Sequence, residues 1–179
     1  MRKIRRIVLH CTSGWPDQTT RSILDYWRNA LGWKQVGYHR LISADGKIEN
    51  LADFAEVTNG VQGYNSDSIH ICYKGGLVRT FKDSSGKTKY VYGDTRTGPQ
   101  KKALEETISN ALWELHGRGQ DISDITIVGH RDLSRDLNGN EIIEEREWVK
   151  VCPTFDAIKE YGAMVSDKAT QRYKKRSTY

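Results

Sequence analysis

Apolar residues recur at two spacings along this chain, and each spacing predicts a different kind of element. Short runs rich in Ile and Val predict strands at residues 3–10, 68–76 and 124–130. Residues 36–51 predict two more strands around an Asp-Gly turn, because that pair supplies the backbone angles of a tight hairpin. Residues 78–97 carry a polar turn between two short β-prone pieces. We expect a surface hairpin there, with a lid over a substrate groove as the alternative.

A spacing of three and four residues between apolar positions predicts helices at residues 19–31, 99–117 and 155–165. The second helix carries the longest apolar stripe, formed by Leu104, Ile108, Ala111, Leu112 and Leu115. Strands therefore alternate with helices along the chain. This order predicts an α/β fold, a single domain in which a central mixed β-sheet is flanked by helices.

Length and charge narrow the picture without choosing a function. A chain of 179 residues suits one domain, and three scattered cysteines are too few for a disulfide framework. The net charge of +5 suits an anionic partner such as nucleic acid, a membrane surface or a cell-wall polymer. Residues 166–179 are basic and lack apolar periodicity. We expect residues 1–165 to form the domain and 166–179 a disordered tail.

The start of the chain does not match a secretory signal. It is basic, but its apolar run from Ile7 to Leu9 is shorter than the roughly 7–15 apolar residues that such a signal needs. No run approaches the ~20 apolar residues of a membrane span. We therefore expect cytoplasmic synthesis without a signal peptide, and action on any extracellular target only after release or lysis.

Two histidines stand where predicted strands end. His10 and His130 close apolar runs, and the carboxyl ends of such strands tend to meet at one edge of a sheet. Cys152 follows across a polar loop. Two imidazoles and a thiolate are suitable zinc ligands, and three protein ligands leave a fourth position for water or substrate. A structural role is the ordinary alternative, since no short-range motif such as HExxH is present.

Five motifs in order strengthen the zinc hypothesis: IVLHCT, VGYHRLISADGKIE, GYNSDSIHICYKGG, IVGHRDL and KVCPTFD. Together they resemble the zinc-dependent N-acetylmuramoyl-L-alanine amidases of type 2, which include phage lysozyme-type amidases and are similar in fold to peptidoglycan recognition proteins. The match covers nearly the whole chain outside the tail. The resemblance implies zinc on His10, His130 and Cys152, a catalytic tyrosine at Tyr38 and a catalytic lysine at Lys150.

The roles implied for Tyr38 and Lys150 agree with the chemistry of amide hydrolysis. Negative charge develops on the amide oxygen as the tetrahedral intermediate forms, and a cation or hydroxyl aimed there stabilises the transition state. Lys150 can supply the cation and Tyr38 the hydroxyl. If residues 150–152 are extended, the side chains of Lys150 and Cys152 lie on the same side. Without the resemblance, Tyr38 would be an ordinary strand aromatic and Lys150 a solvated lysine.

The chain departs from the family pattern at two positions. Many members have a histidine where this chain has Gly60, and that histidine can contact the substrate. Conversely, His70 stands where a glycine is usual. His70 either compensates from a neighbouring strand or faces solvent.

The loop before Cys152 carries a second metal-like spacing. Residues 136–147 place oxygen-bearing side chains at loop positions one, three, five and twelve, which are Asp136, Asn138, Asn140 and Glu147. This is the spacing of an EF-hand calcium loop, although Glu141 replaces the expected glycine at position six. We keep two hypotheses: a Ca2+ site, and a polar turn held by Asn and Asp hydrogen bonds.

The function that these observations predict is hydrolysis of peptidoglycan in cell-wall degradation. Zinc-activated water would cleave the amide between N-acetylmuramic acid and the L-alanine of the stem peptide. The alternative is a catalytically weak peptidoglycan-binding or sensing protein of the same fold, because of Gly60. The hypothesis of a nucleic-acid-binding protein rests only on the net charge and the basic tail. We therefore expect peptidoglycan, and no specific nucleic acid, as the partner.

Overall fold

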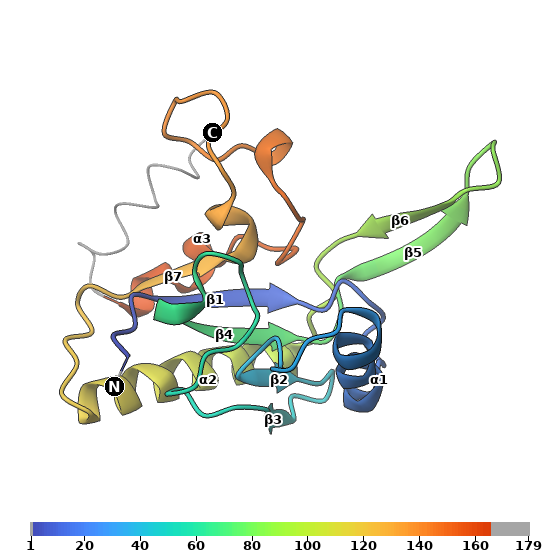
Figure 1. The fold of residues 1–179 in the computed structure, drawn as a ribbon. Helices are drawn as coiled ribbons and strands as arrows, with labels where there is room; N and C mark the ends of the chain where they lie inside the picture. The colour runs from blue at the N-terminus through green and yellow to red at the C-terminus, as the bar shows by residue number, and fades with distance from the viewer. Residues whose placement is uncertain (1, 166–179) are drawn as a thin grey trace.

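The computed structural model describes residues 2–165, so the predicted tail at 166–179 lies outside the described residues. A five-stranded sheet of order β3-β2-β4-β1-β7 forms the centre, and β5 and β6 form a separate hairpin (Figure 1). The strands are β1 (Arg6–Cys11), β2 (Arg40–Ile42), β3 (Ile48–Asn50), β4 (Ser68–Tyr73), β5 (Leu77–Lys82), β6 (Thr88–Tyr92) and β7 (Thr126–Gly129). The helices are α1 (Thr20–Asp25), α2 (Gly98–Gly117) and α3 (Ala157–Tyr161). The predicted α/β fold with a mixed sheet is confirmed.

The middle of the sheet is parallel, with β1 between β4 and β7. β2 runs parallel to β4, and β3 pairs antiparallel with β2 at the edge. Helices and loops cover both faces, so β1 and β4 are buried along nearly their whole length. The register sets His10 opposite Cys72, and Leu9 opposite Gly129. The carboxyl ends of the three strands therefore meet at one edge.

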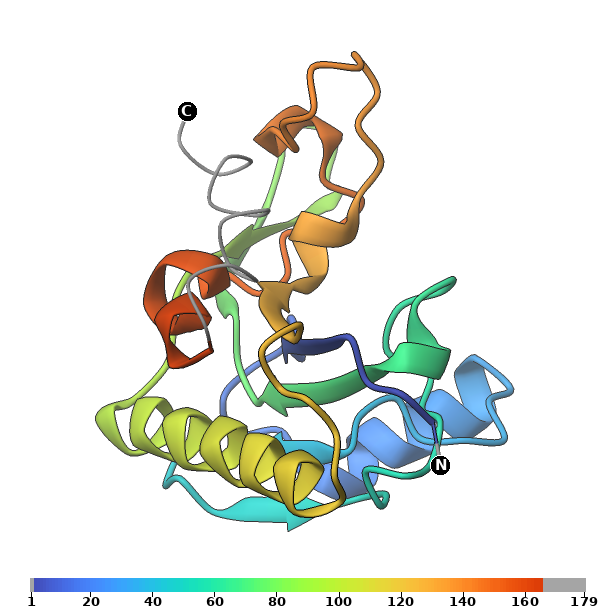
Figure 2. The same cartoon turned by 90° about the vertical axis from the view of Figure 1, so that its left-hand side faces the viewer.

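Alternate residues of β1 face two different layers. Ile7 and Leu9 belong to the main core, which also holds the apolar stripe of α2 and residues of α3. Val8 lies on the opposite face with Val61 and Val128. Figure 2 shows α2 on one side of the sheet and α1 on the other, and α3 packs against β7 at the edge of the sheet. His10 is two residues from Val8, so it lies on the face that α1 covers.

The helices begin and end for identifiable reasons. Thr97 caps α2, because its hydroxyl accepts the amide of Gln100 at 3.1 Å while the Gln100 side chain accepts the amide of Thr97. α1 is shorter than predicted, since the chain passes into a π-helical turn at Tyr26–Ala30. The last helix is also shorter, and a 3-10 turn follows at Gly162–Met164.

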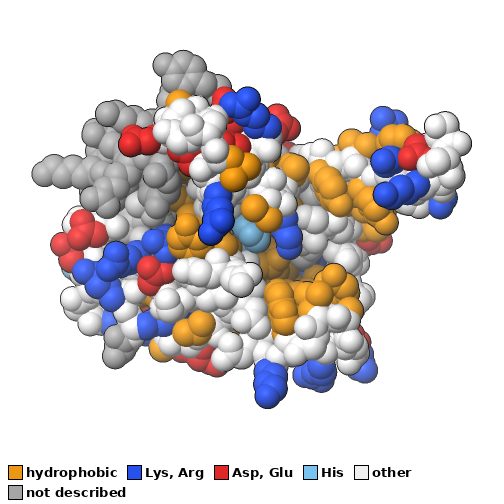
Figure 3. Space-filling view, turned by 45° about the horizontal axis from the view of Figure 1, so that its top comes forward, with side chains coloured by type: hydrophobic (Ala, Val, Ile, Leu, Met, Phe, Trp, Pro, Cys, Tyr) orange, Lys and Arg blue, Asp and Glu red, His pale blue; other side chains and the backbone are white. Residues whose placement is uncertain are grey.

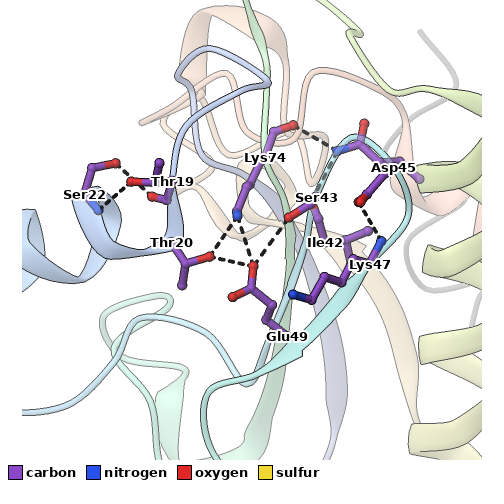
Figure 4. A network of polar contacts seen from close by, with 10 residues as sticks. Thr19, Thr20, Ser22, Ile42, Ser43, Asp45, Lys47, Glu49 and Lys74 are labelled. Carbon is purple, nitrogen blue, oxygen red and sulfur yellow. Dashed lines mark hydrogen bonds and ion pairs between the residues drawn. The ribbon is translucent and has the colours of Figure 1, made fainter.

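A buried ion pair joins three elements on the α1 side of the sheet (Figure 4). The ammonium of Lys74, directly after β4, lies 3.0 Å from a carboxylate oxygen of Glu49 on β3 and donates to the Thr20 hydroxyl at 2.8 Å. Lys74 is buried, so each of its two partners compensates part of the cost of taking the charge out of water. The network fixes the start of α1 against the sheet.

The predicted surface hairpin is confirmed. β5 and β6 pair antiparallel and project from the end of the sheet toward which β1 and β4 point (Figure 1). The Asp83 carboxylate orders the turn by accepting the amides of Ser85 and Lys87 at 2.9 and 3.0 Å. Within residues 2–165, no helix combines the length and the apolar character that a membrane span needs.

Candidate metal centre and active site

The structure brings the three predicted metal ligands together. His10 lies near the end of β1, His130 directly follows β7, and Cys152 comes from the loop before α3. One ligand atom from each residue lies within 4.8 Å of the other two. The Cys152 sulfur is 3.7 Å from Nδ1 of His10. A tetrahedral zinc ion with bonds of about 2.0–2.3 Å separates its ligand atoms by roughly 3.3–3.8 Å, so this pair fits zinc.

Three contacts hold Cys152 in place. A Cβ at Gly129 would lie 2.5 Å from Cδ of Pro153, so only glycine lets this proline approach the end of β7. The Arg131 amide donates to the Cys152 carbonyl at 2.6 Å. The Cys11 amide donates to the Cys152 sulfur at 3.3 Å. The G-H and C-P motifs are therefore two halves of one contact.

The ionisation of the cluster suits a cation. Burial lowers the pKa of His10 well below its ordinary value, and His130 adds to this effect. Burial and the nearby Lys150 lower the pKa of His130 to about 4. Both imidazoles are therefore neutral at pH 7, the form in which histidine binds metals. Burial raises the pKa of the Cys152 thiol, and a divalent cation beside the sulfur would reverse that preference.

Tyr38 and Lys150 lie beside this cluster. The Tyr38 ring centroid is 4.8 Å from that of His10, and burial raises the tyrosine pKa well above its ordinary value. Tyr38 therefore keeps its hydroxyl proton at neutral pH. The Lys150 side chain is exposed. Both residues line a cavity of about 820 Å³ together with His130 and Cys152.

The segment that carries Lys150 and Cys152 is not extended, which corrects the sequence-based expectation. The Cys152 amide donates to the Lys150 carbonyl at 2.9 Å, so the chain makes a tight turn at Val151. The turn sends the lysine toward solvent and the cysteine into the interior. Both nevertheless line the same cavity.

Aromatic side chains form much of the remaining wall of the cavity. Tyr26, Trp27 and Trp33 come from the α1 side, and Tyr92 comes from β6. Figure 3 shows a histidine exposed near the middle of one face of the molecule, with hydrophobic and basic side chains around it. Such a surface suits a ligand with both sugar-like apolar faces and negative charge.

His70, which the sequence left between two interpretations, is fully buried rather than solvent-facing. Its Nδ1 lies 3.1 Å from Nε2 of His10. A Cβ at Gly60 would lie 2.3 Å from the His70 ring. The two departures from the family pattern are therefore in direct contact. Both departures were visible in the sequence. The contact between Gly60 and His70, however, depends on how the loop that carries Gly60 folds over β4.

The structure does not support calcium binding in the loop at 136–147. Asp136 accepts the amides of Gly139 and Glu141, at 2.7 and 2.6 Å. Glu147 accepts the amides of Leu137 and Glu144, each at 2.9 Å. The side-chain oxygens at Asn138 and Asn140 likewise accept amides two residues ahead. These bonds are the polar turn of the alternative hypothesis, with Glu141 at φ 64° in the glycine position.

Comparison with known proteins gives a consistent result. The family model described as N-acetylmuramoyl-L-alanine amidase matches residues 1–153. The endolysin of Klebsiella phage KP32 is 39% identical over 153 residues, which cover 84% of this chain and 81% of that protein.

Two solved structures are similar in fold. The Ph2119 endolysin from a Thermus scotoductus bacteriophage has a TM-score of 0.58 at 23% identity, covering 94% of this chain and 86% of its own. A chain of the complex between tracheal cytotoxin and the peptidoglycan recognition proteins LCa and LCx has a TM-score of 0.62 at 17% identity. That match covers 90% of this chain and 82% of the other.

Proposed function

Because this chain belongs to the N-acetylmuramoyl-L-alanine amidase family, we propose that it cleaves the amide between N-acetylmuramic acid and L-alanine in peptidoglycan. The observation that carries the proposal is the convergence of His10, His130 and Cys152 beside a cavity that Tyr38 and Lys150 also line. The donor set and the 3.7 Å spacing of one pair fit zinc as the resident metal.

Zinc held by these three residues supplies Lewis acidity, which polarises a carbonyl and makes bound water acidic. The protein contributes the geometry. Neutral His10 and His130 leave the positive charge of the ion uncompensated, whereas the Cys152 thiolate offsets one unit of it. The Cys11 amide, 3.3 Å from the sulfur, stabilises the thiolate form.

Lys150 and Tyr38 complete the catalytic set in this proposal. Lys150 lines the cavity and brings a positive charge to it, which can stabilise the amide oxygen as that oxygen gains negative charge during attack. Tyr38 remains protonated at neutral pH, because burial raises the pKa of its hydroxyl. It can therefore donate a hydrogen bond to the same oxygen. Both contributions grow as charge develops, so they lower the barrier rather than only tightening binding.

The decisive experiment is digestion of purified peptidoglycan. Zinc-loaded protein is expected to release peptides with new free L-alanine amines and to leave the saccharide strands intact. Chelation should stop the release, and zinc should restore it where magnesium does not. New reducing sugar ends, or cleavage between stem residues, would contradict the proposed bond.

A second candidate function is peptidoglycan binding without efficient turnover. Gly60 favours it, because the family histidine that can contact substrate is missing there. Cosedimentation with insoluble peptidoglycan separates the two candidates. A pure binding protein would sediment equally with and without chelator and release no amines. As related endolysins suggest, we place the activity at the cell wall after release from the cytoplasm.

A further inference from the structure

We propose that His70 is a positioning residue for the metal centre: it fixes the ring orientation and tautomer of His10, in space that Gly60 leaves open. The inference rests on the proposed zinc site and adds a determinant that acts through His10 rather than on the substrate.

The two nitrogens of His10 face different partners. Nδ1 faces the Cys152 sulfur at 3.7 Å, and Nε2 faces Nδ1 of His70 at 3.1 Å. A metal on Nδ1 of His10 requires that the single ring proton be on Nε2. That proton then points at His70, whose Nδ1 must accept it. The hydrogen bond thus selects the one tautomer of His10 that can bind the metal through Nδ1.

The position of His70 is itself fixed. Its backbone amide donates to Nδ1 of His39 at 2.9 Å, and the His39 and His70 rings stack at 6.0 Å with 21° between their planes. β4 pairs with β1 so that His70 lies opposite Val8, two residues before His10. The acceptor is therefore held by the sheet rather than by a loop.

Gly60 is the steric counterpart of His70. A Cβ there would lie 2.3 Å from both Cγ and Nδ1 of the His70 ring, which is closer than real contacts allow. Any side chain at position 60 would therefore displace the His70 ring.

Space filling alone does not account for a histidine at this position. Nε2 of His70 is buried and has no hydrogen-bond partner among the described residues. An aliphatic side chain would fill the space without that unsatisfied donor. The contact that compensates is the one to His10, so the polar atom at Nδ1 is the feature to test.

The first test is the affinity for zinc, measured by competition with a chromophoric chelator. His70→Leu keeps the volume and removes the acceptor, and we expect affinity to fall about 10- to 100-fold, the usual effect of losing such a partner. His70→Asn sets an amide oxygen near the position of Nδ1 and is expected to recover most of the affinity. Cys72→Ala is the matched control. Cys72 lies on β4 opposite His10, and the zinc affinity of this variant should equal that of the parent.

Gly60→Ala tests the same contact without touching His70. The added methyl group should displace the ring and weaken zinc binding to a similar extent. If His70→Leu or Gly60→Ala fails to fold, nitrogen-15 NMR of the zinc-loaded parent still shows which nitrogen of His10 carries the proton. We expect a proton on Nε2 of His10 that couples to His70; a proton on Nδ1 would overturn the proposal.

The outcomes separate this proposal from the proposed function. Parent-like zinc affinity in folded His70→Leu would overturn the role of His70 and leave the amidase proposal intact. A parent protein that binds no zinc would overturn both. Reduced affinity in His70→Leu that His70→Asn does not recover would assign His70 to packing only.

Discussion

Two regions of this molecule have spacings typical of metal sites, and their structures differ. The cluster of His10, His130 and Cys152 collects one donor atom from each of three distant segments. The loop at 136–147 takes all its oxygens from one short stretch. In the cluster, the sulfur and the imidazole nitrogens face one another. In the loop, the oxygens of Asp136 and Glu147 already accept backbone amides.

The difference shows what spacing alone omits. A donor atom favours a cation when the fold has taken it out of water without giving it a stronger partner. The fold does this for Cys152, which is 3% exposed and whose sulfur, a weak acceptor, receives the Cys11 amide at 3.3 Å. Glu147 is also buried, but its carboxylate holds the loop together through the amides of Leu137 and Glu144. The spacing of possible metal ligands is therefore only a hypothesis of a metal site. Whether those ligand atoms already have hydrogen-bond partners decides it.

Removing the Cys152 sulfur should give the largest loss of zinc affinity. A smaller loss would contradict the view that the cluster, unlike the loop, is a metal site. Cys152→Ser is expected to lower zinc affinity by more than about 100-fold, since loss of a mere partner of a ligand already costs 10–100-fold. Hydrolysis of peptidoglycan should fall below detection. Metal analysis after gel filtration measures the first effect. The Cys72→Ala control should retain stoichiometric zinc, although it costs some stability.

Removing the charge of Lys150 should separate chemistry from metal binding. Lys150→Met is expected to retain zinc and to lower kcat by about 10²–10³, the usual cost of losing a transition-state charge partner. Lys150→Arg should recover part of the rate. Lys159→Met, an exposed lysine on α3, is the matched control and should have parent turnover. Equal turnover in Lys150→Met would remove this residue from the mechanism.

Acid should affect the histidines in and beside the cluster and the acidic loop in different pH windows. Burial lowers the pKa of His39 to about 4, and His130 has a similar value. Unfolded histidines bind protons below about pH 6.5 and the folded ones do not, so stability falls as pH drops from 6.5 to 4. His39 and His130 each contribute about 3 kcal/mol to this loss. The amides of Glu144 and Leu137 lower the pKa of Glu147, so its contribution is lost only below about pH 4.5.

Urea unfolding of zinc-free protein across this pH range measures the effect. A curve that stays flat from pH 6.5 to 4.5 would contradict the assignment of neutral buried histidines. His39→Gln should remove about one histidine's share of the slope, provided that the variant retains the native fold.

Breaking the loop should have a smaller effect that leaves the metal site intact. Glu147→Gln replaces one of the two accepting oxygens by an amide group, so one backbone donor loses its partner. We expect a loss of about 1–2 kcal/mol in the free energy of unfolding. Zinc affinity should stay within about twofold of the parent, a difference well below 1 kcal/mol. A large loss of zinc would show that the loop also positions Cys152.

Calcium should have the smallest effect. The loop oxygens already have amide partners, so calcium added to zinc-saturated protein is expected to change Tm by less than about 1 °C, a fraction of 1 kcal/mol. Loosely bound ions are removed with a chelator before the measurement, and magnesium is added to a parallel sample for comparison. A calcium-specific rise in Tm that Asp136→Asn abolishes would restore the EF-hand hypothesis.

The sequence predicted the parts of the site that local pattern controls. His10 and His130 could be placed because apolar runs end at them, and the ordered motifs linked them to Cys152. The α2 stripe and the β5–β6 hairpin were also predicted, since periodicity and turn residues determine them locally. The tight turn at Val151 was not predicted, because a single backbone hydrogen bond from Cys152 to Lys150 produces it.

The contact of His70 with Gly60 could not be predicted from spacing. It joins a strand to a loop, and its cause is a missing side chain at one position and a large ring at the other. A sequence shows both residues but not that they meet. The close approach of Pro153 to Gly129 is hidden in the same way.

The backbone hydrogen bond from Cys11 to the Cys152 sulfur joins residues 141 positions apart in the chain. A zinc ion held by His10 and Cys152 would close the same long loop through coordinate bonds, as a removable cross-link. Since an ion that binds only the folded chain stabilises it by about 2.7 kcal/mol at 100 times its Kd, the cross-link strengthens with zinc supply. Zinc availability would then govern not only turnover but also how long the protein survives among proteases.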